Sequence, residues 1–220
     1  MAATEEPAPA VRESPWDERP PLVRALANND KDDISSLLDS GEDINFMWTA
    51  QLPFKTRRSI EGISMCRYPI DFAAAASSLE IVQFLVDRGA RLDISNALHA
   101  AAAAVGCSEE DQSERVKVIE FLLTQGMDIN KLEFAGEEDF ANQYWGRPYG
   151  TPLHYAASWG WPKIVECLLD NGADRDVHAV SYKSKVDYGT ALDWQKSNDP
   201  DEGMYNRRVL VLLGGNEDKL

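Results

Sequence analysis

The chain has 220 residues and a formal net charge of −15 at pH 7, from 37 acidic and 22 basic side chains. An acidic surface repels phosphate groups, so we expect neither a nucleic acid nor a membrane as the partner. The cysteines Cys66, Cys107 and Cys167 are scattered and lack metal-ligand spacing, which favours reduced thiols over a disulfide or a metal site. These features predict a cytoplasmic or nuclear protein, monomeric and without a metal or a cofactor.

The first 19 residues are rich in proline and glutamate, a composition typical of partly disordered extensions. Within them, Ser14 to Asp17 could instead begin a short helix that caps the domain, with Trp16 packed on the helices that follow. We expect residues 20–215 to form one elongated domain and residues 216–220 to be a C-terminal tail.

Five stretches of the domain share one pattern, in which a short opening helix precedes a helix with an apolar stripe and a final glycine. The opening residue and the closing glycine of each stretch are Leu22 and Gly41, Ile70 and Gly89, Leu98 and Gly126, Leu153 and Gly172, and Leu192 and Gly214. In the first, second and fourth stretches the two are 19 residues apart. A constant helical length with variation confined to turns is typical of a solenoid.

The fourth stretch shows the physical reason for the pattern. Thr151 is placed to cap the opening helix, Pro152 occupies the first helical position, and Gly160 ends the helix. Pro162 begins the second helix, and Gly172 supplies a left-handed C-terminal stop. Such a pair cannot bury its own apolar face, so it requires neighbours of the same kind.

The phrases Thr151-Pro152-Leu153-His154-Tyr155-Ala156-Ala157 and Ile164-Val165-Glu166-Cys167-Leu168-Leu169-Asp170-Asn171-Gly172-Ala173-Asp174 resemble the ankyrin repeat. The resemblance covers about residues 20 to 215 and implies an all-α fold, an ankyrin-type solenoid of about five helix-turn-helix repeats. It also implies that His99 and His154 form hydrogen bonds with neighbouring turns. In the third copy, residues 106–114 are expected to lengthen the turn between the two helices, and the fifth copy has an insertion at the same place.

The loops between repeats, called fingers in this family, depart from the usual pattern. From each closing glycine to the next opening residue the separation is 29, 9, 27 and 20 positions, against about 14 in ordinary members, so three fingers are enlarged. Their aromatic residues either fold back on the solenoid or line a binding site. The finger residues that we predict as walls of such a site are Trp48, Phe134, Tyr144, Trp145, Tyr149 and Tyr188.

By resemblance, the two residues after the Ala-Ala pair of each opening helix face the concave groove. The predicted floor consists of Ala75, Ala76, Ala103, Ala104, Ser158 and Trp159. Small side chains there would let a ligand enter deeply, although alanine is also favoured in any helix. The family implies a protein-interaction module that binds a partner protein or peptide through this groove.

The alternative function is a small-molecule site or a cofactor-free enzyme, such as an isomerase or a cyclase. A carboxylate in an apolar pocket can act as a general acid or base, and the candidates among the finger aromatics are Glu133, Glu137, Glu138, Asp139 and Asp187. A charged loop is more often simply solvated, and no catalytic signature of the known kinds is present in the sequence. The interaction module is therefore the preferred interpretation, and any enzymatic role stays open.

Overall fold

The computed structural model describes residues 20–47, 66–104, 108–141, 148–199 and 204–215. The predictions for Trp16, Trp48, Tyr144 and Trp145 lie outside these residues, as does the C-terminal tail. The described part of the chain is helical, and strand pairing within it is limited to isolated bridges in the fingers.

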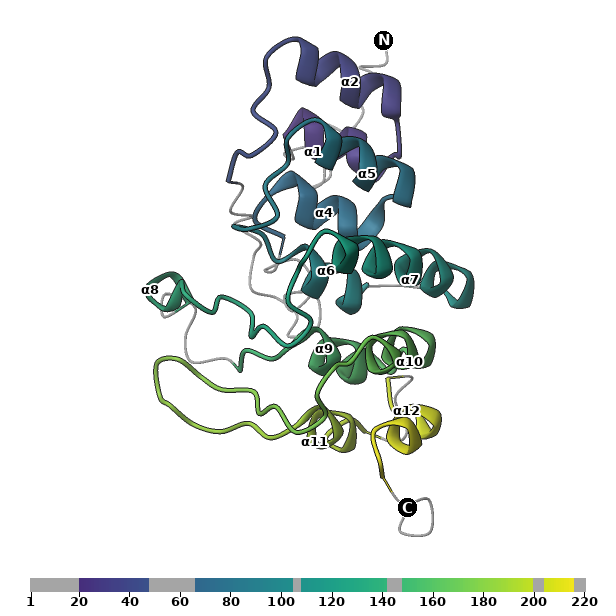
Figure 1. Cartoon of the computed structure of the whole chain (residues 1–220), viewed down its shortest axis with the longest axis vertical. Coiled ribbons are helices and arrows are strands. Elements are labelled where there is room, and N and C mark those ends of the chain that lie inside the picture. The colour runs from purple at the N-terminus through teal and green to yellow at the C-terminus, as the bar shows by residue number, and fades with distance from the viewer. Residues whose placement is uncertain (1–19, 48–65, 105–107, 142–147, 200–203, 216–220) are drawn as a thin grey trace, which may run out of the picture.

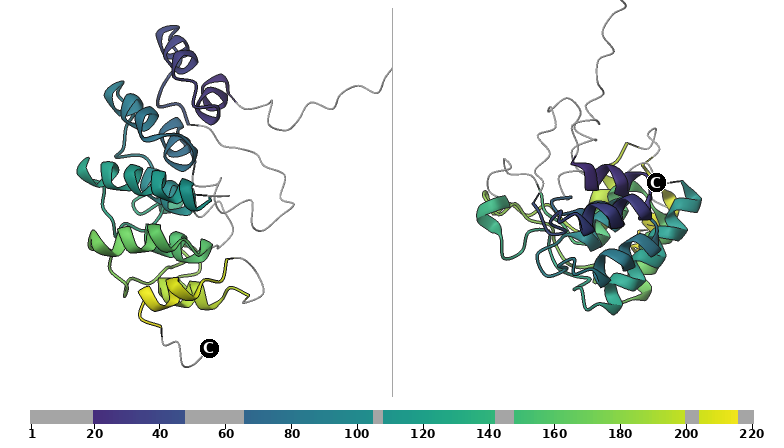
Figure 2. Two further views of the ribbon diagram at one scale, coloured as in Figure 1. Left: turned by 90° about the vertical axis from the view of Figure 1, so that its right-hand side faces the viewer. Right: turned by 90° about the horizontal axis from the view of Figure 1, so that it is seen from above.

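Helix pairs are stacked one above another along the long axis of the molecule (Figures 1 and 2). Each opening helix packs against its own partner and against the opening helix of the next pair. The pairs are α1 (Pro21–Ala27) with α2 (Lys31–Asp39), α4 (Pro69–Ala76) with α5 (Leu79–Asp87), α6 (Ala97–Ala103) with α7 (Glu109–Thr124), α9 (Pro152–Trp159) with α10 (Pro162–Asp170), and α11 (Ala191–Lys196) with α12 (Arg207–Leu212). The five predicted repeats are confirmed. The longest of these helices is α7, and no helix of the described ranges is long and apolar enough to cross a bilayer.

The closing glycines end the second helices in one common way. Gly41, Gly89, Gly126, Gly172 and Gly214 all have a positive φ. At Gly172 the backbone N–H donates to the Leu169 carbonyl, and the next N–H, of Ala173, donates to the Leu168 carbonyl. This reciprocal pair is the Schellman arrangement, which satisfies two carbonyls at the end of a helix. The same two bonds recur at the other four glycines, so each repeat leaves its second helix in the same direction.

The third repeat differs from the sequence prediction. Residues 106–114 do not all form a turn, because α7 begins at Glu109 and incorporates most of the insertion. Ser108 caps this start: its hydroxyl accepts from the Asp111 N–H, and the Asp111 carboxylate accepts from the Ser108 N–H. The prediction of a longer turn was wrong because a capping box followed by helix-forming residues extends the helix instead.

The added turns of α7 hold the neighbouring repeats through polar side chains. Buried Arg115 donates to the carbonyls of Ala74 and Ser77 at the end of α4. The preceding residue, Glu114, accepts from the Leu79 N–H at the start of α5, at 2.8 Å. A cation at a helix C-terminus and an anion at an N-terminus both complement the helix dipole. The insertion therefore connects the third repeat to the second at two helix ends.

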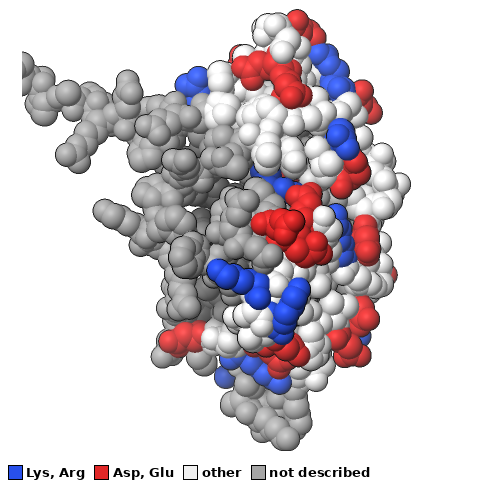
Figure 3. All heavy atoms as spheres, turned by 90° about the vertical axis from the view of Figure 1, so that its left-hand side faces the viewer, with Lys and Arg blue, Asp and Glu red and all other residues white. Residues whose placement is uncertain are grey.

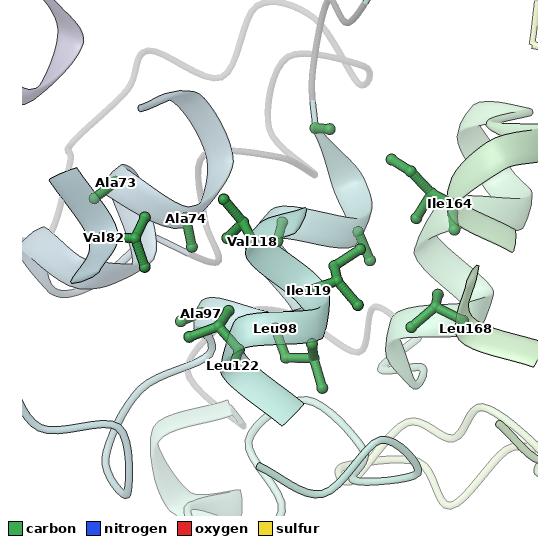
Figure 4. Close-up of a cluster of buried hydrophobic side chains, with 14 of the residues drawn as sticks. Ala73, Ala74, Val82, Ala97, Leu98, Val118, Ile119, Leu122, Ile164 and Leu168 are labelled. Atoms are coloured by element: carbon green, nitrogen blue, oxygen red, sulfur yellow. The ribbon is translucent and has the colours of Figure 1, made fainter. Parts of the chain in front are cut away.

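The apolar core runs continuously through the stack. In the close-up of Figure 4, Val118, Ile119 and Leu122 of α7 lie between side chains of α4 and α5 on one side and of α10 on the other. In the second helices of the central repeats, Leu85, Leu122 and Leu168 are fully buried. Their counterparts in the terminal repeats, Leu38 and Leu212, are only half-buried, because a terminal repeat has a neighbour on one side only.

We expect Leu168→Ala to lower the free energy of unfolding by about 2–5 kcal/mol, because it opens a cavity at a fully buried position. Leu212→Ala, the equivalent change in the half-buried last repeat, should cost clearly less. Urea titration followed by circular dichroism measures both. Equal losses for the two variants would contradict the assignment of Leu168 to the centre of the core.

Candidate functional site

In the second, third and fourth repeats, a polar residue at the fourth position of the opening phrase joins one finger to the next. Asp71 accepts from the Asn96 N–H at 2.8 Å, His99 Nε2 lies 2.9 Å from the Lys131 carbonyl, and His154 Nε2 lies 3.2 Å from the Gly189 carbonyl. In the last repeat, Asp193 accepts from the backbone N–H and the hydroxyl of Thr190 in its own turn. The predicted hydrogen bonds of His99 and His154 are thus confirmed.

The protonation of His154 follows from its partners. The backbone N–H of Thr151 can only donate, so Nδ1 of His154 is an acceptor and its other nitrogen carries the proton toward Gly189. Burial lowers the pKa of His154 to about 4, and the same cause lowers the pKa of His99 to about 4. Both side chains are therefore neutral links between repeats rather than acids or bases near pH 7.

Asp71 replaces histidine in the second repeat and is completely buried. Its carboxylate accepts from the backbone N–H groups of Arg67 and Tyr68, at 2.9 and 3.0 Å, besides that of Asn96. Burial raises the pKa of Asp71 to about 7, although these three donors and the nearby Arg67 act in the opposite direction. All of the described partners of Asp71 are backbone groups that position the fingers.

The third and fourth fingers lie against each other and form a second small core. Tyr149 and Val180 pair as an antiparallel bridge, with N···O distances of 2.9 and 3.1 Å between their backbones. The ring of Tyr149 stacks on Tyr182 at 5.1 Å and meets Phe134 edge-on at 5.5 Å. Ala141, from the short helix α8 (Glu138–Ala141), closes the cluster. Phe134 and Tyr149, predicted as walls of a groove, are thus buried in the fingers' own core.

Glu133 connects this finger core to the opening helices. Its side chain is fully buried, and its carboxylate accepts from the hydroxyl of Tyr155 on α9. The backbone carbonyl of Glu133 accepts from the Tyr182 hydroxyl at 2.8 Å. Tyr155 in turn packs with Ala103 and with the half-buried rings of Trp159 and Trp194. The candidate acid or base Glu133 therefore has a clear structural role between two clusters.

The other candidate carboxylates lie in more accessible places. Glu137 pairs with the buried guanidinium of Arg67, which also lies 4.8 Å from the centre of the Phe134 ring. Asp139 is exposed, and exposed Asp187 accepts from His178 Nδ1 at 2.7 Å when that ring is protonated there. The contacts of Glu137 and Asp187 are of the kind that hold loops in place.

The predicted floor residues divide into two groups. Ala103 and Ala104 are 1% and 2% exposed, so they do not form an open floor. Ala104 ends α6 in a left-handed conformation, with φ of 33°. Ala75, Ser158 and Trp159 are half-buried, and Ala76 is exposed. Tyr188, from the fourth finger, is 39% exposed.

Sequence reasoning missed the aromatic partners of Trp159. Trp161 stacks on it, with the ring centres 6.4 Å apart and the planes 5° from parallel. Trp194 contributes a half-buried ring from α11 and donates its indole N–H to the Tyr188 carbonyl at 3.1 Å. On the face that carries the fingers, acidic side chains gather near the middle with basic ones just below them (Figure 3). The accessible side of the opening helices thus combines small residues, tryptophan rings and charged finger tips.

Stacked helix pairs that are closed by the same glycine turn, with a polar fourth residue joining successive fingers in the central repeats, define an α-solenoid built from helix-turn-helix repeats. The family model described as "Ankyrin repeat" matches residues 150–181. The chain is an ankyrin repeat protein.

Several curated proteins are similar to this chain over part of its length. It is 26% identical over 155 residues to "Ankyrin repeat, SAM and basic leucine zipper domain-containing protein 1" of Dasypus novemcinctus, covering 69% of this chain and 26% of that protein. It is 35% identical over 77 residues to Rabankyrin-5 of Mus musculus, covering 35% of this chain and 6% of the relative. With palmitoyltransferase AKR1 of Lachancea kluyveri it shares 28% over 105 residues, 48% of this chain and 12% of the relative. The chain spans about a quarter of the first of these proteins.

The neutral histidines predict a loss of stability in acid. A histidine whose pKa is lowered from 6.5 to about 4 stabilises the fold fully above pH 6.5, and this contribution disappears as the pH falls toward 4. For His154 we expect a loss of about 2–3 kcal/mol between pH 7 and pH 4.5. His154→Gln should therefore show a smaller decrease over this range than the wild-type protein. Urea unfolding at the two pH values measures the difference.

For Asp71 the stability contribution should change with pH in the opposite direction to that of His154. Because its folded pKa is raised to about 7, the folded state binds the extra proton, and the stability contribution of Asp71 falls as the pH rises from about 4 to 7. Asp71→Asn removes this opposing effect, so the variant should lose stability in acid more steeply than the wild-type protein. A shallower acid dependence in Asp71→Asn would contradict the assignment.

Proposed function

We propose that the chain is a protein-interaction module that binds a partner segment on the side of its opening helices, between α4 and α11. The carrying observation is that Ala76 is exposed, and Ser158 and Trp159 are half-buried, on helices that form this one side of the stack. Tyr188 adds a 39% exposed aromatic ring from the fourth finger. Small residues beside accessible aromatic rings provide a surface that a partner side chain can approach closely.

Aromatic side chains account for much of the energy of protein interfaces, because they bury a large area at a low cost in conformational entropy. Trp194 is held in place before binding by the Tyr155 ring and by the hydrogen bond from its indole N–H to the Tyr188 carbonyl. A fixed ring loses less entropy when a partner binds than a mobile one does. The cluster thus has the properties of a preorganised contact area, and it is the part of the groove that we consider central.

The buried wall residues Phe134 and Tyr149 support this surface without belonging to it. Their packing fixes the third and fourth fingers to each other, and Glu133 fixes the third finger to α9. The fingers therefore meet a partner as one body. The alternative of acid–base catalysis on a small molecule has less support, since the carboxylates of Glu133 and Glu137 hold the hydroxyl of Tyr155 and the guanidinium of Arg67.

Two tryptophan substitutions on opposite sides of one repeat test the proposal. Ala76→Trp adds bulk at an exposed position at the end of α4, and Gln83→Trp adds the same bulk on the exposed surface of α5. Because neither position is buried, we expect both variants to keep the wild-type Tm within about 2 °C. Affinity capture from lysate with quantitative mass spectrometry should show proteins that bind the wild-type chain and Gln83→Trp but are lost with Ala76→Trp.

The reverse pattern, in which Gln83→Trp loses the partners and Ala76→Trp keeps them, would place the interface on the outer helices. Partners that survive both substitutions would contradict the proposal for this part of the stack. A thermal-shift screen of small molecules with the same three proteins covers the alternative, which gains support only if a compound stabilises the wild-type chain in the absence of any protein partner.

A further inference from the structure

Three indole N–H groups in and beside the last two opening helices differ in whether they have a hydrogen-bond acceptor. The Nε1 of Trp161 donates to the Ala103 carbonyl at 3.1 Å, and that of Trp194 donates to the Tyr188 carbonyl at 3.1 Å. The Nε1 of Trp159 is buried and has no hydrogen-bond partner among the residues that the structure describes. Buried indole donors in folded proteins nearly always have an acceptor, so this exception requires an explanation.

Packing alone does not explain the choice of tryptophan at this position. The Trp159 ring stacks on Trp161 and packs on Ala103 and Tyr155, contacts that a phenylalanine ring could largely provide. The indole adds a donor that destabilises the free fold, because the N–H loses its water without gaining an acceptor. Residues that break a local rule of stability in this way are expected where function requires them. Here the residue lies on the face proposed to bind a partner.

The chemistry around Trp159 indicates which acceptor fits. The third finger is joined to the same cluster through Glu133 and Tyr155, and besides Glu137, which is paired with Arg67, it carries the exposed Glu138 and Asp139. The whole chain has a net charge of −15. A carboxylate or a phosphate would be repelled by these charges, whereas a neutral carbonyl on a basic segment would be attracted.

We propose that Trp159 donates its indole N–H to a backbone carbonyl of an extended, basic peptide segment of the partner, an inference that rests on the function proposed above. Because Nε1 is covered in the free protein, binding includes a rotation of the half-buried ring that carries the N–H toward the peptide. The bond is made only in the complex, so the donor contributes to affinity at the expense of the stability of the free chain.

The test uses the full chain and a library of random linear peptides displayed on phage. Peptides selected on the wild-type protein are synthesised, and their affinities are measured by isothermal titration calorimetry. Trp159→Phe keeps a ring and removes the donor, and Trp161→Phe is the matched control, because it removes a donor that is already satisfied inside the fold. We expect selected peptides rich in lysine and arginine, a loss of affinity of about tenfold or more with Trp159→Phe, and a change of less than about threefold with Trp161→Phe.

Thermal unfolding supplies an independent readout. Trp159→Phe should leave Tm unchanged or raise it, whereas Trp161→Phe should lower it by leaving the Ala103 carbonyl without its donor. In wild-type protein labelled with ¹⁵N, the indole N–H resonance of Trp159 should shift on peptide binding and become protected from hydrogen exchange. This measurement does not depend on whether the variants fold.

The outcomes separate the two proposals. If no linear peptide binds, the peptide-binding function itself is contradicted. If the peptides bind the wild-type protein but not the Ala76→Trp variant, the interaction face is supported. If the Trp159→Phe variant then binds them as well as the wild-type protein does, the role assigned to the indole is wrong. Selected peptides dominated by aspartate and glutamate, or an indole resonance that does not change in the complex, would also overturn the role assigned to Trp159.

Discussion

A pair of short helices exposes more apolar surface than the two can cover between themselves, and the structure of this chain depends on that constraint. Each pair is stable only against the next one, so the constraint requires a stack. It also requires that every pair leave its second helix in the same direction, which explains why one glycine-dependent turn closes all five repeats. The exposed fractions follow the same principle: Leu122 and Leu168, with neighbours on both sides, are buried, whereas Leu212, near the end of the stack, is not.

Polar contacts add specificity to this apolar stack. Arg115 and Glu114 fix the third repeat to the second through the ends of α4 and α5. His99 and His154 link successive fingers through backbone carbonyls, which are present whatever the finger sequence. The apolar core can therefore stay regular while the fingers vary in length, because each link needs only one backbone carbonyl of the next finger within hydrogen-bond distance of the histidine. The same links make the position of the fingers sensitive to acid, since a charged histidine could not remain buried there.

The repeats could be predicted from the sequence because their signals are local. Pro152, Gly160 and Gly172 act within a few residues of their own positions, and the structure places each where the pattern indicates. The start of α7 was also a local signal, the pair Ser108 and Asp111, but it lay inside a segment interpreted as an insertion. The burial of Phe134 and Tyr149 could not be predicted in this way. It depends on contacts between two fingers, such as that of Tyr149 with Tyr182, which are distant in the chain and which the helical period does not specify.

At the candidate site, the sequence does not predict which tryptophan has a hydrogen-bond acceptor for its indole N–H. Trp159 and Trp161 are two residues apart, yet within the described part of the chain the indole of Trp161 has an acceptor and that of Trp159 has none. The difference originates in another repeat. Ala104 turns into a left-handed conformation and ends α6, which leaves the Ala103 carbonyl without a partner in its own helix and available to Trp161. Whether the indole of Trp161 is satisfied thus depends on how a neighbouring helix ends, which a pattern within one repeat does not specify.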